Sequence, residues 1–86
     1  MEFEFDNQKS RFNKEKHGID FVEAQILWCD ISRVEIPATT KDELRMLVVG
    51  TISKKHWTAI VTYRGNKTRV ISVRRDRPEE VQMYES

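Results

Sequence analysis

The side chains best suited to chemistry in this sequence are arginines, and they gather towards its C-terminal end. Residues 44–77 carry nine Lys or Arg and one acid, Asp76, which gives a net charge of +8. The acids elsewhere bring the formal net charge of the 86 residues down to +1. A cluster of positive charge concentrates polyanions at the nearby surface, whatever the total charge of the protein. The block therefore predicts a surface that binds phosphate, with the alternative that it only keeps a sheet in solution.

Arginine suits phosphate because its guanidinium stays charged and presents a planar fork of N–H donors. Arginines that emerge from strands are held in fixed geometry, so they can also stabilise charge that develops on a phosphate group during reaction. Aromatic side chains near the basic block could stack on unpaired bases of RNA, or they could be ordinary core or edge residues. These aromatics are Trp57, for which the core is favoured, and Tyr63 and Tyr84.

Several side chains could move protons next to such a surface. Histidine is the residue type that changes charge near neutral pH, and the sequence has two, His17 and His56. His17 falls where a helix is expected to end, so it either moves protons or only caps helix carbonyls. Glu80 precedes Tyr84 by one helical turn, so the two share a helix face. Glu80 could accept a proton, as could Glu43 and Glu79, or it could form a salt bridge with an arginine of the last strand.

Other chemistries find little support in the sequence. Two histidines and one cysteine, Cys29, without ligand-like spacing predict no metal site, and no cofactor motif is present. RNA cleavage needs neither, because the 2′-hydroxyl of the substrate can attack the adjacent phosphate. A single cysteine allows no internal disulfide, and the chain has neither a signal peptide nor an apolar run of roughly 18 residues, so the cytoplasm is the expected location.

The N-terminal half predicts a strand and two helices within one small domain, residues 1–86. Alternating Glu and Phe predict a strand over 1–5, and Asp6 suits the N-cap of a polar helix over 7–16 that Gly18 ends. Phe12 is the only large apolar residue of this helix and the expected anchor. A second helix is predicted over 21–29, with Asp20 and Glu23 spaced as a capping box. Its expected apolar stripe is Phe21, Ala24 and Trp28, with Leu27 beside them.

The C-terminal half predicts strands and one short helix. Strands are expected over 33–36 (stopped by Pro37), 44–52, 57–64 and 67–75, with a loop over 38–43, a turn over 53–55 and a helix over 78–84. The order is β-α-α-β-β-β-β-α, which predicts an α+β fold: an antiparallel sheet packed by the N-terminal helices, with a short C-terminal helix.

The pair Gly65-Asn66 suits a two-residue hairpin loop, which would fix the register of the last two strands. The pairs expected on one face are Tyr63–Thr68, Val61–Val70, Ala59–Ser72 and Trp57–Arg74. Those expected on the other face are Thr62–Arg69, Ile60–Ile71 and Thr58–Val73. Both faces mix apolar centres with polar ends, so the alternation does not say which face is buried.

Residues along nearly the whole chain resemble the BrnT family of ribonuclease toxins from bacterial type II toxin–antitoxin modules. The most specific part of the resemblance is the run Arg69-Val-Ile-Ser72-Val-Arg74-Arg75 followed by Glu80 and Tyr84. The other matching positions are Phe5-Asp6, Lys9, Asn13, Lys16-His17-Gly18, Phe21, Glu23-Ala24, Glu43, Arg45, Gly50 and Tyr63. Two positions depart from the family pattern, which usually has arginine at Val81 and alanine at Val73.

The resemblance implies a RelE-like fold, an endoribonuclease activity without a metal that arrests growth, and neutralisation by a BrnA-like antitoxin. Antitoxins of that family are of the ribbon-helix-helix type, so DNA would be reached only through the antitoxin. On this hypothesis the catalytic residues are Arg69, Arg74, Glu80, Tyr84 and His17, and the RNA-binding residues are Arg45, Tyr63, Arg64, Lys67 and Arg75. The alternative is a degenerate, non-catalytic module that binds the antitoxin and takes part in regulating the operon.

Overall fold

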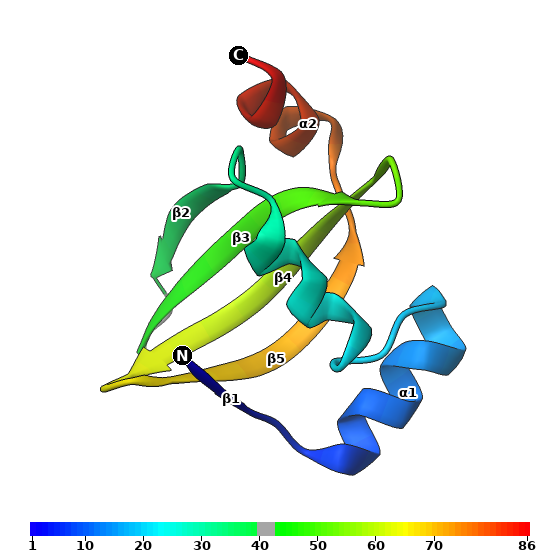
Figure 1. Cartoon of the computed structure of the whole chain (residues 1–86), viewed down its shortest axis with the longest axis vertical. Coiled ribbons are helices and arrows are strands. Elements are labelled where there is room, and N and C mark those ends of the chain that lie inside the picture. Colours follow the sequence, from blue (N-terminus) through cyan, green and yellow to red (C-terminus); the bar gives the residue numbers. More distant parts are fainter. Residues whose placement is uncertain (40–42) are drawn as a thin grey trace.

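The computed structural model describes residues 1–39 and 43–86. Its elements are β1 (Glu2–Glu4), α1 (Asn7–His17), the 3-10 helix η1 (Glu23–Cys29), β2 (Val34–Thr39), β3 (Leu44–Ile52), β4 (Lys55–Arg64), β5 (Lys67–Arg75) and α2 (Pro78–Glu85). The five strands form one sheet in the order β1-β5-β4-β3-β2 (Figure 1). The predicted α+β class and order of elements are confirmed. No helix within the described ranges is long and apolar enough to cross a membrane.

The sheet is mixed, so the prediction of a purely antiparallel sheet was wrong. β1 runs parallel to β5, with Glu2 beside Lys67 and Glu4 beside Arg69. The other neighbouring strands pair antiparallel. Hairpins force the antiparallel direction on β3, β4 and β5, whereas β1 leads into α1 and no hairpin fixes its direction.

The helix α1 is capped as predicted but anchored differently. The Asp6 carboxylate accepts hydrogen bonds from the backbone N–H groups of residues 8 and 9, and Gly18 adopts the left-handed conformation with φ of 84°. Phe12, the expected anchor, is 58% exposed, and the buried residues of α1 are Ser10 and Asn13. The Asn13 side chain donates to the carbonyl of Val73 at 2.9 Å and accepts from its N–H at 3.2 Å. Asn13 therefore pairs the backbone C=O and N–H of Val73 on the part of β5 that β1 does not reach. Buried polar backbone groups need such hydrogen-bond partners.

The predicted second helix forms as a 3-10 helix, η1. The capping box is present: the N–H of Glu23 donates to Asp20 at 2.8 Å, and the N–H of Asp20 donates to the Glu23 carboxylate at 3.0 Å. A 3-10 helix repeats every three residues, so Ala24 and Leu27 of η1 are fully buried, as is Phe21 just before it, whereas Trp28 of the expected stripe is half-buried and packs against the same core. Phe21, Ala24 and Leu27 belong to the same core cluster as the sheet residues Val48, Trp57, Ala59, Val61, Val70 and Val73.

β2 continues through Pro37, which was expected to stop it. Pro37 pairs with Met46 of β3 inside the ladder. A proline cannot donate to a neighbour, but β2 is an edge strand and needs only one partner strand. The predicted loop over 38–43 is therefore shorter, because β2 ends at Thr39; residues 40–42 of that prediction lie outside the described residues.

The two predicted hairpins form, and β3 has the predicted bounds. β4 begins at Lys55, two residues earlier than expected, because Ser53 and Lys54 both take positive φ and close a two-residue loop. The loop at Gly65-Asn66 is confirmed by the pairing of Arg64 with Lys67.

A β-bulge changes the predicted register in the second half of the β4–β5 ladder. The pairs Tyr63–Thr68, Thr62–Arg69 and Val61–Val70 are confirmed, but the register shifts between Ile60 and Val61. Beyond the shift the observed pairs are Ile60–Ser72, Ala59–Val73, Thr58–Arg74 and Trp57–Arg75, so the four pairs predicted there were wrong. Ile71 is the extra residue. A bulge of this kind reverses which face the following side chains occupy.

Candidate functional site

The register decides which face of the sheet is buried. Val48 pairs with Ala59, and both belong to the core, as do their neighbours on the same face, Trp57 and Val61. Successive side chains of a strand alternate between faces. The opposite face therefore carries the cations at the alternate positions: Arg45, Arg64, Lys67, Arg69 and, beyond the bulge, Arg74. We call this the basic face.

The bulge is what places Arg74 on the basic face. Val70 and Val73 are both core residues although they are three positions apart, which a regular strand would not allow. Arg74 then lies opposite Thr58 instead of Trp57. Bulges often redirect side chains at functional sites in this way.

Arg74 is fixed by Glu80 of α2 in a two-pronged ion pair. Its Nη1 and Nη2 donate to the two carboxylate oxygens of Glu80 at 2.7 and 2.8 Å. Nη1 also donates to the carbonyl of Arg75 at 3.2 Å. A guanidinium has five N–H groups. Nε–H and one N–H of Nη2 thus have no hydrogen-bond partner among the described residues, and they remain available for a ligand.

Glu80 is 4% exposed and its carboxylate is saturated with donors. Besides Arg74 it accepts from the N–H of Arg77 at 2.8 Å and from the hydroxyl of Thr58 at 3.0 Å. The hydrogen bonds from Arg74 outweigh burial and lower the pKa of Glu80 to about 2. The salt-bridge alternative for Glu80 is confirmed. A carboxylate this stable in its ionised form is a poor proton acceptor and a good anchor for Arg74.

Tyr84, like Glu80, is held by hydrogen bonds within the fold. Its hydroxyl donates to Asp30 at 2.6 Å and lies 3.4 Å from the hydroxyl of Thr51. The hydrogen bond to Asp30 raises the pKa of Tyr84. The same Asp30 oxygen accepts from the N–H of Thr51 at 3.0 Å, so Tyr84 ties α2 to β3 and to the end of η1.

His17 lies apart from Glu80 and Tyr84, at the outer edge of β5. It lines a cavity of about 200 Å³ together with Ile71 and Ser72, the two residues at the bulge. The remaining residues around this cavity are Lys9, Phe12, Asn13, Lys16 and Phe21. The structure thus brings His17 beside Ser72, with two lysines of α1 nearby.

Two of the predicted RNA-binding residues are not on the basic face. Tyr63 shares the core-side face of β4; its hydroxyl donates to Glu35 at 2.6 Å, and burial together with this bond raises the pKa of Tyr63 to about 12. Arg75 pairs with Trp57, and its guanidinium lies 5.2 Å from the centre of that ring. The structure does not bring these two side chains together with Arg64 and Arg69.

Arg45 and Arg64 meet at Glu43 on the basic face. Arg45 Nε lies 3.4 Å from one carboxylate oxygen of Glu43, and Arg64 Nη2 lies 3.9 Å from the other. Arg64 is well exposed. This end of the basic face therefore combines two arginines with one acid, whereas Arg69 and Arg74 lie further along β5.

Thr58 and Asp76, two residues beside the Arg74–Glu80 pair, were not among the predicted site residues, and His56, considered above as a residue that could move protons, lies next to them. The Thr58 hydroxyl oxygen lies 2.6 Å from Asp76 Oδ1 and 3.0 Å from Glu80 Oε1. His56 Nδ1 lies 3.6 Å from Asp76 Oδ2. Burial is the main cause that raises the pKa of Asp76. The only signal in the sequence was that Asp76 is the single acid of the basic block.

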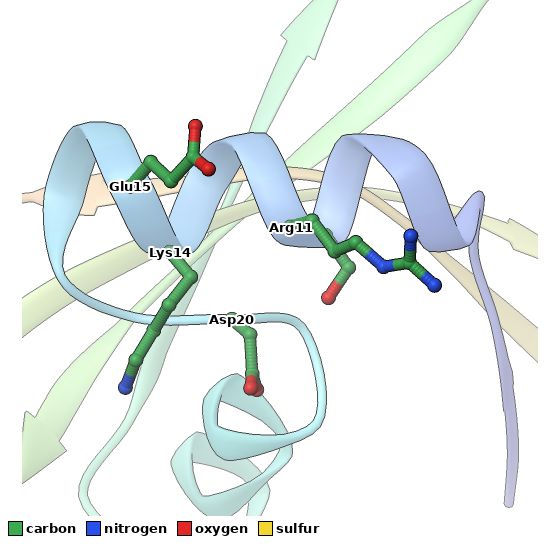
Figure 2. Close-up of a pocket in the computed structure, with 5 residues that line it drawn as sticks. Arg11, Lys14, Glu15 and Asp20 are labelled. Atoms are coloured by element: carbon green, nitrogen blue, oxygen red, sulfur yellow. The ribbon is translucent and has the colours of Figure 1, made fainter.

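A further cavity, of about 320 Å³, lies between α1 and the segment that leads into η1. Figure 2 shows Lys14 and Asp20 directed to the same side of α1, with Arg11 further along the helix. Lys14 is paired with Glu23 at 2.7 Å. The two bases and two acids that line this cavity balance in charge, and none of the predicted site residues lines it. This cavity therefore does not extend the basic face.

A family model described as "Ribonuclease toxin, BrnT, of type II toxin-antitoxin system" matches residues 5–80. The matched segment includes α1, the whole sheet beyond β1, the bulge and Arg74, and it ends at Glu80; Tyr84 lies outside it. No curated protein gives a significant match to the sequence. The match covers most of the 86 residues and agrees with the basic face described above. The chain belongs to the BrnT family of ribonuclease toxins of type II toxin–antitoxin systems.

Proposed function

We propose that this chain is a single toxin domain with a RelE-like fold that cleaves cellular RNA in the cytoplasm without a metal and so arrests growth. A cognate BrnA-like antitoxin of the ribbon-helix-helix type neutralises it, and DNA is contacted only through that antitoxin. The observation that carries the proposal is the position of Arg74. The bulge directs it to the basic face, and the buried Glu80 holds its guanidinium in one orientation.

The basic face supports binding of an RNA backbone. Arg64, Lys67 and Arg69 follow one another across the β4–β5 hairpin, with Arg45 beside them, and would hold successive phosphates. Arg74 would contact the reacting phosphate through Nε–H and Nη2–H. In the reaction the 2′-hydroxyl attacks the adjacent phosphorus, the bond to the 5′-oxygen breaks, and the charge on the phosphate oxygens increases. A preorganised guanidinium stabilises that charge.

Among the predicted proton-transfer residues, His17 has the most suitable surroundings. Ser72, Lys9 and Lys16 line its cavity, and the two lysines would attract a phosphate. Glu80 acts as the positioning residue of Arg74, because its carboxylate is already saturated. Tyr84 positions α2 through Asp30.

The experiment that tests the proposal is RNA cleavage by the purified chain in the presence of a chelator. Arg74→Ala is expected to lower the rate by roughly 100-fold or more, the usual effect of removing one donor to a developing anion. Arg11→Ala is the matched control, because Arg11 is an exposed arginine of α1 that lies off the basic face. Equal losses in both variants, or cleavage that requires a metal, would contradict the proposal.

A second candidate is a non-catalytic toxin-like protein that binds the antitoxin and takes part in operon regulation. The observation that favours it is the environment of Glu80, a predicted catalytic residue whose carboxylate is held as a structural anion. The two candidates are separated by inducing the chain alone in cells. Growth arrest with loss of intact RNA supports the ribonuclease. Normal growth with folded product, which still binds the antitoxin, supports the binding protein.

A further inference from the structure

Asp76 is the single acid of the basic block and its side chain is only 1% exposed. Its Oδ1 lies 2.6 Å from the hydroxyl of Thr58. Its Oδ2 and the Nδ1 of His56 are both buried without a hydrogen-bond partner among the described residues, and they lie 3.6 Å apart. Buried polar atoms nearly always form hydrogen bonds. The protonation states of Asp76 and His56 should therefore account for these two unpaired atoms.

The hydroxyl of Thr58 has more acceptors than it can serve. It lies within hydrogen-bond distance of two carboxylate oxygens, Asp76 Oδ1 at 2.6 Å and Glu80 Oε1 at 3.0 Å. A threonine hydroxyl carries one hydrogen and can donate only one hydrogen bond. If both acids were ionised, one of them would face a lone pair of Thr58 at close range. A second hydrogen must therefore lie on one of the two carboxyl groups.

Glu80 cannot be the group that carries this hydrogen. Its two oxygens already accept from both terminal nitrogens of Arg74 and from the N–H of Arg77. Every one of these partners is a donor, so a proton on Glu80 would displace one of them. Asp76 has no such donors, and the 2.6 Å separation is typical of an O–H···O hydrogen bond.

We propose that Asp76 is a protonated carboxylic acid at neutral pH and acts as a positioning residue of the ribonuclease site through Thr58 and Glu80. Asp76 Oδ1–H donates to Thr58, the Thr58 hydroxyl donates to Glu80, and Glu80 holds Arg74. His56 is then neutral with its hydrogen on Nδ1, directed at Asp76 Oδ2. The hydrogens of Asp76 and Thr58 then each have one acceptor, and both oxygen–oxygen contacts of Thr58 are hydrogen bonds. The inference deepens the function proposed above and rests on it for the role of Arg74.

The surroundings of the pair favour the neutral form over an ion pair within it. Asp76 is faced by the Glu80 carboxylate from α2, by His56 from β4 and by Arg74 from β5. His56 is faced in turn by the Tyr84 ring at 5.4 Å and by Glu85 Oε2, 3.8 Å from its Nε2. Arg74 is already neutralised by Glu80, so a charged Asp76 would add a second buried anion without its own cation.

Ionisation of Asp76 would loosen Arg74. An ionised Asp76 would take the Thr58 hydrogen for itself, and Glu80 would lose one of its donors while gaining a neighbouring negative charge. Because a carboxylic acid ionises as pH rises, RNA cleavage should be highest below the pKa of Asp76. Above it, cleavage should fall by about tenfold per pH unit if only the neutral form is active.

The first test is NMR of the isotope-labelled wild-type protein without RNA. The carboxyl carbon of Asp76 is expected to keep the chemical shift of the protonated acid at pH 7, where the other carboxyl groups are ionised. The ¹⁵N shifts of His56 are expected to show the neutral ring with hydrogen on Nδ1. An ionised Asp76 beside a doubly protonated His56 at pH 7 would overturn the proposal. This readout stands even if the chain does not cleave RNA, so the two proposals fail separately.

The second test is the pH profile of cleavage in two variants. Asp76→Asn keeps one donor and one acceptor but cannot ionise, so it is expected to retain activity within a few-fold and to abolish the fall at high pH. Thr58→Val breaks the link and should lower the rate at every pH. Glu85→Gln, which removes the exposed charge near His56, is the control and should keep the wild-type profile. Loss of activity in a folded Asp76→Asn protein, comparable to that of Arg74→Ala, would show that the charge is required and would overturn the proposal.

Discussion

Arg74 and Glu80 are joined by two parallel hydrogen bonds of 2.7 and 2.8 Å between a strand of the sheet and the C-terminal helix. The pair lies where the basic face meets α2, the end of the sheet at which β5 finishes in Figure 1. It orients an arginine for phosphate and attaches α2 to the sheet. Its energetics can therefore be tested by stability as well as by activity.

Glu80→Gln should destabilise the protein at neutral pH and remove part of its sensitivity to acid. The folded-state pKa of Glu80 is about 2, against 4.5 in the unfolded chain, so its contribution is complete above about pH 4.5 and is lost as the pH falls towards 2. The loss at pH 7 should be about 3 kcal/mol, because the substitution leaves the largely buried guanidinium of Arg74 without its anion. Urea denaturation at pH 7 and pH 3 measures both effects.

Glu79→Gln is the matched control, since Glu79 is the exposed neighbour on the same first turn of α2. Its free energy of unfolding should follow the wild-type dependence on pH. An equal effect of the two substitutions would show that the charge of the first turn, and not the pair with Arg74, stabilises α2.

Arg69→Ala and Arg75→Ala should affect RNA binding differently although both arginines belong to β5. Arg69 lies on the basic face opposite Thr62, whereas Arg75 lies on the other face above Trp57. Binding of single-stranded RNA, measured over a range of salt concentrations, should lose about 0.7 from its log–log slope in Arg69→Ala, the share of one phosphate contact. Arg75→Ala should keep the wild-type slope. The reverse result would contradict the assignment of the faces.

Asn13→Ala should destabilise the protein strongly, although Asn13 is a polar residue of a mostly polar helix. Its side chain donates to the carbonyls of Ile19 and Val73 and accepts from the N–H of Val73, all of them buried bonds. Loss of the amide leaves these backbone groups unpaired, and the expected cost is about 3 kcal/mol. Thermal or urea unfolding checks it, with Gln8→Ala, an exposed position of the same helix, as control. A change below that of the control would show that water replaces the amide.

Gly50→Ala should also destabilise the fold, by about 1–3 kcal/mol. A Cβ at this position would lie 3.1 Å from Leu27 Cδ2 and 3.2 Å from Asp30 Oδ2. Neither neighbour can yield easily, because Leu27 is fully buried and the Asp30 oxygen is bonded to Thr51 and Tyr84. The free energy of unfolding from urea curves is the measurement. An unchanged value would mean that η1 shifts without loss.

Features that depend on neighbours a few residues away could be predicted from the amino-acid sequence. The Asp6 cap, the capping box of Asp20 and Glu23, the end of α1 at Gly18 and the Gly65-Asn66 loop all form as predicted. In each of them the residue that fixes the backbone lies within about four positions of the backbone that it fixes. The order of the elements and the concentration of cations followed from the same kind of local information.

Which of these cations lie together on one face depends on the tertiary fold. The bulge at Ile71 reverses which face of the sheet the following residues of β5 occupy. The sequence of residues 67–75 contains no signal for this bulge, because the bulge goes with the packing of both Val70 and Val73 into one core. The continuation of β2 through Pro37 and the parallel direction of β1 depend on which strands form the edges of the sheet. The chain from His56 through Asp76 and Thr58 to Glu80 joins residues up to 24 positions apart, counting from 56 to 80. Contacts of that separation depend on the whole fold, so alternation and spacing could not predict them.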